Sequence, residues 1–370
     1  MTEKRNSRRD YALRLAAAVF AALLLLSGCG VTGDKAADEP VSDLQETESG
    51  DPGLITVGFS QLGAESDYRS ASTESMRRTF TTENGYELLF EDGQQKQANQ
   101  IKAIRIFIQR EVDYIVLAPV TETGWDTVLM EAKNAGIPVI LMDRMVDVED
   151  DSLFTCWIGS DFELEGRKAA AWLKAFAAES GILPSDLHIV NIQGTIGASA
   201  QIGRTKGLSD AAAAEGWDLL DEVTGDFTQA RGREVMADLL KKYDNINVVY
   251  CENDNEALGA IEAIEEAGKK TGSDIRDGEI LVISFDGVKR EAMENVLSDR
   301  ISCIAQCNPL QGPMIEHVIR QMENGETPEK FSYVEEGIYS AIESVRTLEL
   351  DGTTYPVTIL TEQILEDRAY

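Results

Sequence analysis

The sequence predicts an α/β protein made of two doubly wound, parallel-sheet domains. From about residue 54 onward, short apolar runs alternate with segments whose apolar residues recur at helical spacing, such as Ile101, Ile104 and Ile108. Strict alternation of strand and helix implies parallel sheets that are covered by helices on both faces. The runs form two series on either side of a longer stretch, residues 143–184. The 370-residue chain also has room for two domains of about 150 residues each, once an N-terminal leader and tether are set aside.

The apolar runs predict strands in a definite order. The first series lies at residues 55–59, 86–90, 114–118 and 139–142, and the second at 187–192, 219–223, 247–251, 280–284 and 301–306. Gly136 with Pro138, and also Gly268, stand where the intervening helices should end. Glycine adopts the left-handed conformation that closes many helices, and proline cannot continue one.

The N-terminus predicts an exported chain. Basic residues precede a short apolar run over residues 15–26, which is typical of a secretory leader and too short for a bilayer span of about 20 residues. Leu26-Ser27-Gly28-Cys29 resembles the lipobox of bacterial lipoproteins, which implies a lipoprotein signal peptide over residues 1–28 and a lipidated Cys29. An ordinary leader with an incidental cysteine is the alternative. Residues 29–53 are polar and acidic, so we expect a disordered tether.

Composition excludes several partners. The net charge of −31 argues against nucleic acid, whose binding needs lysine and arginine to neutralise phosphates. It also disfavours contact between the protein surface and anionic lipid, so the lipid on Cys29 is the expected membrane contact. His188 and His317 have no cysteine or histidine at metal-ligand spacing, and we expect no metal site.

The remaining cysteines do not form a disulfide framework. Cys303 and Cys307 fall at the two ends of one predicted strand segment, about 13 Å apart, whereas a disulfide needs Cα atoms within about 7 Å. We expect buried free thiols at these positions and at Cys156 and Cys251. A bridge from Cys156 to Cys303 or Cys307 is the alternative.

Polar residues follow nearly every predicted strand. Ligands of open parallel sheets bind beyond the carboxyl ends of the strands. Each residue alone also fits a turn or a helix cap, but the recurrence in both series predicts a cleft for a small polyhydroxylated ligand. Tyr68 and Phe227 stand nearby to cover an apolar sugar face. The strand-end residues are Ser60, Asp92, Pro119 and Asp143-Arg144 in the first series, and Gln193, Asp226-Phe227, Asn253-Asp254, Asp286 and Gln306 in the second.

These motifs together resemble a known family. The chain is similar to the substrate-binding proteins of sugar ABC transporters, within the ribose-binding-protein group and nearest to its galactofuranose-binding type. The resemblance covers residues 54–330, and the chain beyond residue 331 departs from the pattern. The matching motifs are Val57-Gly58-Phe59-Ser60-Gln61, Asp92-Gly93-Gln94-Gln95-Lys96-Gln97, Ala118-Pro119-Val120, Gly124-Trp125, Asp143-Arg144, Gln193-Gly194-Thr195-Ile196-Gly197-Ala198-Ser199, Gly225-Asp226-Phe227-Thr228, Asn253-Asp254 and Phe285-Asp286-Gly287.

The resemblance implies a periplasmic binding protein type I fold, with two Rossmann-like lobes joined by a three-stranded hinge. The N-terminal lobe would hold residues 54–158 and 307–333, and the C-terminal lobe residues 159–306 and 334–370. Gln306 matches ribose binders, whereas the galactofuranose type has an acidic residue there. Trp125 would be either a lid over the sugar or a packing residue. The implied sugar contacts are Glu65, Tyr68, Arg69, Asp143, Arg144, Arg204, Phe227, Asn253, Asp286 and Gln306.

No enzyme motif competes with this interpretation. No G-x-G-x-x-G follows the first strand, and the sequence has neither a nucleophile elbow nor a metal-binding helix motif. We therefore expect a monomeric, non-enzymatic lipoprotein without a cofactor, on the outer face of the cytoplasmic membrane. It would capture a monosaccharide, in a furanose form such as galactofuranose, and deliver it to an ABC permease and its ATPase. The alternative is a sensory lipoprotein that presents bound sugar to a membrane receptor kinase.

Overall fold

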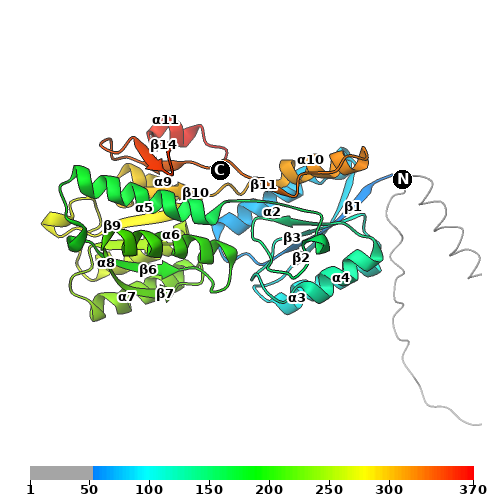
Figure 1. Ribbon diagram of the computed structural model, residues 1–370, viewed down its shortest axis with the longest axis horizontal. Helices are drawn as coiled ribbons and strands as arrows, with labels where there is room; N and C mark the ends of the chain where they lie inside the picture. The colour runs from blue at the N-terminus through cyan, green and yellow to red at the C-terminus, as the bar shows by residue number, and fades with distance from the viewer. Residues whose placement is uncertain (1–52) are drawn as a thin grey trace, which may run out of the picture. The chain divides into compact units, whose positions relative to one another are not determined.

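The computed structural model describes residues 53–370 (Figure 1). The predicted signal peptide, Cys29 and the predicted tether up to residue 52 lie outside the described residues. The described chain forms two sheets with their helices, and we call these the first lobe and the second lobe. Among residues 53–370, no helix has the length and apolar character needed to cross a membrane.

The first lobe is built on a six-stranded sheet in the order β11-β5-β4-β3-β1-β2, in which every neighbouring pair is parallel. Helices α3 and α4 pack on one face, and α2 and α10 pack together on the other (Figure 1). Its elements are β1 (Ile55–Gln61), α2 (Asp67–Thr79), η1 (Thr82–Asn84), β2 (Tyr86–Asp92), α3 (Gln97–Gln109), β3 (Tyr114–Leu117), α4 (Asp126–Ala135), β4 (Val139–Met142), η2 (Asp151–Leu153), β5 (Cys156–Gly159), α10 (Gly312–Glu323) and β11 (Phe331–Tyr333).

The second lobe is built on an eight-stranded sheet in the order β13-β14-β12-β10-β9-β8-β6-β7. The strands from β10 to β7 are parallel, whereas β12 joins β10 antiparallel and β13 with β14 forms an antiparallel hairpin. Its elements are α5 (Phe162–Glu179), η3 (Pro184–Asp186), β6 (His188–Gln193), α6 (Ser199–Glu215), β7 (Asp218–Thr224), α7 (Gln229–Lys242), β8 (Val248–Cys251), α8 (Asp254–Glu266), η4 (Ile275–Asp277), β9 (Leu281–Asp286), α9 (Arg290–Leu297), β10 (Cys303–Gln306), β12 (Ile338–Ser340), β13 (Thr347–Leu350), β14 (Thr353–Ile359) and α11 (Glu362–Glu366).

Buried apolar side chains on both faces of each sheet explain the near-continuous apolar strands. In the first lobe, Leu117 and Leu141 face the helices α3 and α4, whereas Val116 and Ile140 face α2 and α10. The predicted α/β class with two doubly wound lobes is confirmed, and each predicted strand is present. Strand β5 and the strands after residue 330 were not predicted as strands.

Three segments connect the two sheets. The first crossover, residues 160–161, leads from β5 to α5; the second, residues 307–311, leads from β10 to α10; the third, residues 334–337, leads from β11 to β12. These crossovers bring residues that are far apart in the sequence to one place between the lobes, where a hinge can act.

Several side chains with open interpretations are part of the structural core. Cys156, Cys251, Cys303 and Cys307 are buried and free. Trp125 is fully buried among the apolar residues beneath α3 and α4, and its Nε1 donates a hydrogen bond to the carbonyl oxygen of Thr121 at 2.7 Å. The packing interpretation of Trp125 therefore fits the structure, and the lid interpretation does not.

Candidate functional site

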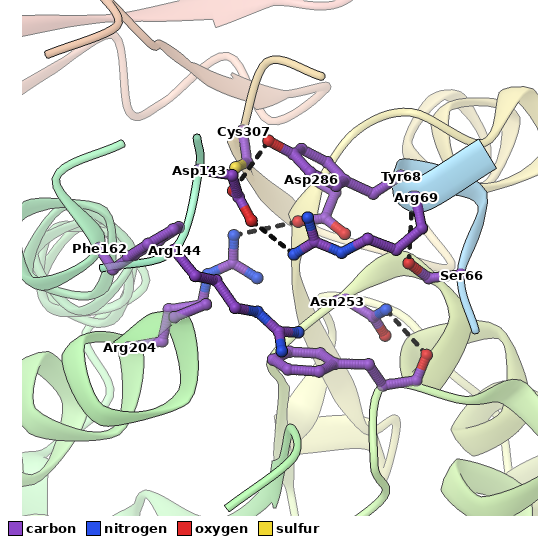
Figure 2. Close-up of a pocket in the computed structure, with 12 residues that line it drawn as sticks. Ser66, Tyr68, Arg69, Asp143, Arg144, Phe162, Arg204, Asn253, Asp286 and Cys307 are labelled. Atoms are coloured by element: carbon purple, nitrogen blue, oxygen red, sulfur yellow. Dashed lines mark hydrogen bonds and ion pairs between the residues drawn. The ribbon is translucent and has the colours of Figure 1, made fainter. Parts of the chain in front are cut away.

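A cavity with about 260 Å³ of empty space, which includes space open to solvent, lies where the two lobes meet. Figure 2 shows that charged and aromatic side chains from both lobes point into this space. Eight of the ten sugar contacts predicted from the sequence line it. The lining residues are Ser66, Tyr68, Arg69, Asp143, Arg144, Phe162, Ala200, Arg204, Phe227, Asn253, Asp286 and Cys307.

Unusual backbone conformations aim several of these side chains. Asp143 directly follows β4, Phe227 follows β7, and Asp286 ends β9. Their φ angles are 63°, 61° and 79°, which is the left-handed region that side-chain-bearing residues rarely adopt. Aspartate tolerates this region better than most residues, but a phenylalanine there is strained. Such strain gathers at functional sites, where the surrounding structure holds it in place.

Asp143 organises the first-lobe half of the cavity. Its carboxylate pairs with Arg69 Nη2 at 2.5 Å and accepts a hydrogen bond from the Tyr68 hydroxyl at 2.9 Å (Figure 2). Ser66 caps helix α2 and so fixes the turn that carries Tyr68 and Arg69. Burial, reinforced by the Asp143 charge, raises the pKa of Tyr68, so its hydroxyl remains a donor at neutral pH.

Arg144 spans the cavity from the first lobe. Its Nη1 donates to the carbonyl oxygen of Val120 at 2.8 Å, and its guanidinium carbon lies 5.1 Å from the centre of the Phe227 ring. Burial, together with the nearby Arg69 charge, lowers the pKa of Arg144 to about 10, which still leaves it protonated at neutral pH. Arg69 Nη1 and Arg144 Nε are buried and have no acceptor among the described protein groups.

Arg204, on helix α6, organises the second-lobe half. It pairs with Glu165 through Nε at 2.8 Å and with Asp286 through Nη2 at 3.0 Å, and Nη1 donates to the carbonyl oxygen of Glu252 at 2.5 Å. All of these side chains are buried. Burial raises the pKa of Asp286, and the Arg204 charge opposes that rise.

Each cavity arginine lies over an aromatic ring. Arg69 lies 4.8 Å from the Tyr68 ring centre, Arg144 lies over Phe227, and Arg204 lies 5.5 Å from the Phe162 ring centre. Cation–π contact of this kind holds a guanidinium in place within about 6 Å of the ring. The expectation that Tyr68 and Phe227 simply cover an apolar sugar face therefore needs revision, because a face of each ring is used to support an arginine.

Asn253 combines a structural role with its place in the cavity. It caps helix α8 by accepting a hydrogen bond from the backbone N–H of Glu256 at 2.8 Å, and its Nδ2 donates to the carbonyl oxygen of Phe227 at 3.0 Å. Asn253 therefore both caps α8 and lines the cavity. Substituting it would alter the loop that carries Phe227.

Buried acids hold the second-lobe loops from behind. Glu252 accepts hydrogen bonds from the Gly194 N–H at 2.9 Å and the Thr205 hydroxyl at 2.5 Å. Asp254 accepts from the backbone N–H groups of residues 287–289, just after Asp286. Burial raises the pKa of Glu252 to about 7, and burial with the Asp286 charge raises that of Asp254 to about 7.

Two of the predicted contacts do not line the cavity. Glu65 is buried behind the arginines, 3.4 Å from Arg69 Nε and 3.7 Å from Arg144 Nη2. Gln306 is turned toward the C-terminal tail, where its side chain donates to the Tyr370 hydroxyl and accepts from the Gly337 N–H. The structure thus places Glu65 in support of the site and Gln306 in the hinge region.

Four lining residues were absent from the sequence prediction. Ser66 lies beside Glu65, Ala200 lies about one helical turn before Arg204, and Cys307 directly follows β10, a predicted strand, whereas Phe162 begins α5 after the unpredicted strand β5. The apolar run Cys156-Trp157-Ile158-Gly159 was the available signal for β5, and recognising it would have placed Phe162 just beyond a strand end.

The lobes are in contact beyond the crossovers. Asp67 and Asn255 form two hydrogen bonds, from the Asp67 N–H at 3.3 Å and from Asn255 Nδ2 at 2.9 Å. The Met145 N–H donates to the Ser199 hydroxyl at 3.0 Å. The described conformation is therefore a closed one, with the cavity between two lobes that touch each other.

Comparison with known proteins identifies the family of this two-lobed chain. Residues 57–327 match the family described as the periplasmic binding protein domain. The galactofuranose-binding protein YtfQ of Escherichia coli K12 is 39% identical over 290 residues, which cover 77% of this chain and 87% of the relative.

Solved structures of sugar-bound proteins are also similar to this chain. A Mycobacterium smegmatis protein in complex with β-D-fucofuranose is 39% identical with a TM-score of 0.73, over 78% of this chain and 91% of the other. The periplasmic binding protein component of the arabinose ABC transporter from Shewanella sp. ANA-3, bound to α- and β-L-arabinofuranose, is 38% identical with a TM-score of 0.70, over 76% and 91%. The chain belongs to the periplasmic binding protein family.

Proposed function

We propose that this protein is an extracytoplasmic sugar-binding lipoprotein that encloses one monosaccharide in its furanose form and delivers it to an ABC permease. The observation that carries this proposal is the convergence of three arginines and two aspartates from both lobes on one cavity. Membership of the periplasmic binding protein family supports a site of action outside the cytoplasm.

The chemistry of the cavity suits sugar hydroxyls. A hydroxyl donates once and accepts twice, so it needs acceptors and donors side by side. Asp143 and Asp286 supply acceptors, and Arg69 Nη1 and Arg144 Nε, which have no acceptor within the described part of the chain, supply donors. Each charged hydrogen bond contributes about 1.5–3 kcal/mol, from which ordering and closure subtract, so we expect micromolar or tighter binding.

The relatives favour a monosaccharide furanose. The two solved relatives reported above, at 38–39% identity, hold fucofuranose and arabinofuranose. Gln306 stands where the galactofuranose type has an acidic residue, but this difference lies outside the cavity, because the Gln306 side chain is turned toward Tyr370.

Attachment and delivery complete the proposal. The Leu26-Ser27-Gly28-Cys29 motif supports lipid on Cys29 and a place on the outer face of the cytoplasmic membrane. The Shewanella relative is the binding component of an ABC transporter, which supports a permease with its ATPase as partner. The protein would act as a monomer, since one chain contributes both halves of the cavity.

Ring size gives the sharpest test. Methyl β-D-galactofuranoside and methyl β-D-galactopyranoside have the same atoms and differ only in the ring. A ligand that binds only the folded state raises the melting temperature, so we expect the furanoside, and free galactose or arabinose, to stabilise the protein. Galactitol, which forms no ring, is the negative control. Equal stabilisation by the pyranoside would contradict the furanose assignment, and no shift with any sugar would contradict sugar binding itself.

A further inference from the structure

A buried and a partly buried carboxyl group lie close together where the crossovers meet. Glu165 lies in the first turn of α5, Glu336 lies in the third crossover, and Cys307 begins the second. One oxygen of each glutamate and the Cys307 sulfur all lie within 4.8 Å of one another. Only Cys307 of this trio lines the cavity itself.

Glu336 ties the three crossovers together. Its Oε1 accepts hydrogen bonds from the Ser160 hydroxyl in the first crossover, at 2.8 Å, and from the Asn308 N–H in the second, at 2.6 Å. Its own backbone carbonyl accepts from Lys168 Nζ at 2.8 Å. One side chain thus bridges the segments that must bend if the lobes move.

Glu165 connects this bridge to the cavity. Its Oε2 accepts from Arg204 Nε at 2.8 Å, and the same guanidinium pairs with Asp286 in the cavity. Its Oε1 is buried and accepts no hydrogen bond from any group among the described residues. The position of the Arg204 guanidinium therefore depends on Glu165.

The groups around Glu165 and Glu336 favour a shared proton over a bound metal ion. The negative charge of one carboxylate disfavours ionisation of the other when both lie this close and are shielded from water. The nearest positive groups, Arg204 and Lys168, are committed to Glu165 Oε2 and to the Glu336 carbonyl, and they would repel a metal ion.

Other titratable groups near the pair are Asp286, Tyr68 and the Cys307 thiol, and Asp161 lies near Lys168. Burial raises the pKa of that thiol well above its usual value, so it stays neutral. Burial also raises the pKa of both glutamates. Arg204 pairs with Glu165 and favours its ionised form, whereas no basic side chain among residues 53–370 forms an ion pair with Glu336, so the proton belongs on Glu336.

We propose that Glu336 keeps its proton at neutral pH and donates it to Glu165, forming a hydrogen-bonded carboxyl pair that fastens all three crossovers to Arg204. Glu165 is then a positioning residue for the cavity, and Glu336 is its proton donor. The consequence for sugar affinity rests on the proposed function, whereas the protonation itself does not.

Stability without ligand tests the protonation. An unfolded glutamate has a pKa of about 4.3, so a folded chain that keeps this proton takes one up on folding. The contribution is fully present below the unfolded pKa and is lost as pH rises through the folded pKa. Between pH 6 and 8, the folding equilibrium constant of the wild type should fall about tenfold per pH unit relative to Glu336→Gln, whose amide keeps the donor without titrating.

The matched control is Glu335→Gln, which removes the same charge from the neighbouring, exposed residue and should follow the wild-type slope. Urea denaturation of the full mature chain gives the equilibrium constants, and other titrating groups cancel in the difference. If the folding equilibrium constants of the wild type and Glu336→Gln change equally with pH, the proposal is overturned. If Glu336→Gln does not fold, Glu165→Gln serves instead, because it removes the carboxylate that accepts the proton and should reduce the wild-type slope.

Sugar affinity is the second readout. For a sugar that binds, the wild-type Kd should rise between pH 6 and 9, whereas that of Glu336→Gln should stay constant. Absence of any binding sugar would contradict the proposed function while the stability difference still decides the protonation. A stability difference without a change in Kd would overturn the positioning role of Glu165.

Discussion

Replacing Arg144 with alanine tests the assignment of the cavity most sharply at the level of one residue. Arg144 is 2% exposed and lies over the Phe227 ring, and its Nε has no acceptor among residues 53–370. Its remaining donor capacity is therefore available to a ligand. The substitution removes a charged donor and also the cation–π support that holds it in position.

The expected loss follows from these contacts. A charged hydrogen bond contributes about 1.5–3 kcal/mol, and a stranded buried acceptor on the sugar adds to the penalty. We expect a loss of at least about 2 kcal/mol, which corresponds to a Kd about 30-fold higher. The Val120 carbonyl also loses its donor, so a small decrease in melting temperature should accompany the loss of affinity.

Calorimetric titration of the folded variant with the cognate sugar measures this effect. Arg105→Ala is the matched control, because the Arg105 side chain is 51% exposed on α3 and pairs with Glu131 on the surface. The control should bind as the wild type does. Unchanged affinity in folded Arg144→Ala would remove Arg144 from the sugar site and refute the interpretation of the cavity.

Three further substitutions probe other parts of the account. In Gly194→Ala the new Cβ would come within 1.9 Å of the Phe227 ring, so we expect a destabilisation of about 1–3 kcal/mol and weaker sugar binding; a wild-type melting curve and Kd would contradict this packing. Burial raises the pKa of Glu252 to about 7, so the stability that its protonated form contributes is present at acid pH and is lost as pH rises toward 7. The unfolding free energy of Glu252→Gln should therefore decline less than that of the wild type between pH 5 and 8. An identical decline in the two proteins would exclude Glu252 as the titrating group. Cys29→Ser should release the mature protein into the soluble fraction, and a protein that stays membrane-bound after a high-salt wash would contradict the lipoprotein assignment.

Much of the candidate site could be predicted because parallel sheets place the carboxyl ends of their strands along one edge. That rule alone brought Asp143, Phe227, Asn253 and Asp286 together from four separate strands. The strands could be predicted from apolar runs because helices cover both faces of each sheet. Arg204 came from the resemblance, since it lies within a helix and follows no strand directly.

The rest depended on tertiary contacts that leave little trace in the sequence. Phe162 reaches the cavity from the start of α5, beyond a crossover whose destination is set by how the two sheets are joined. Gln306 ends its strand, yet the tail residue Tyr370 holds its side chain elsewhere, and Cys307, the next residue, lines the cavity instead. Glu65 is withdrawn behind the cavity by its pairing with two arginines.

The central claim is that one sugar is held by both lobes and stabilises their closed arrangement. The cavity takes Asp143 and Arg144 from the first lobe and Arg204 and Asp286 from the second, so each lobe alone holds half of the contacts. A sugar can shift the balance between open and closed forms only through its greater affinity for the closed form.

Small-angle scattering with and without saturating sugar measures this shift most directly. The account predicts a smaller radius of gyration in the presence of the sugar. It also predicts that Asp286→Ala leaves the free protein's radius unchanged but abolishes the decrease. An identical radius with and without a sugar whose binding is confirmed by calorimetry would contradict closure, and the affinity would then have to come from one lobe.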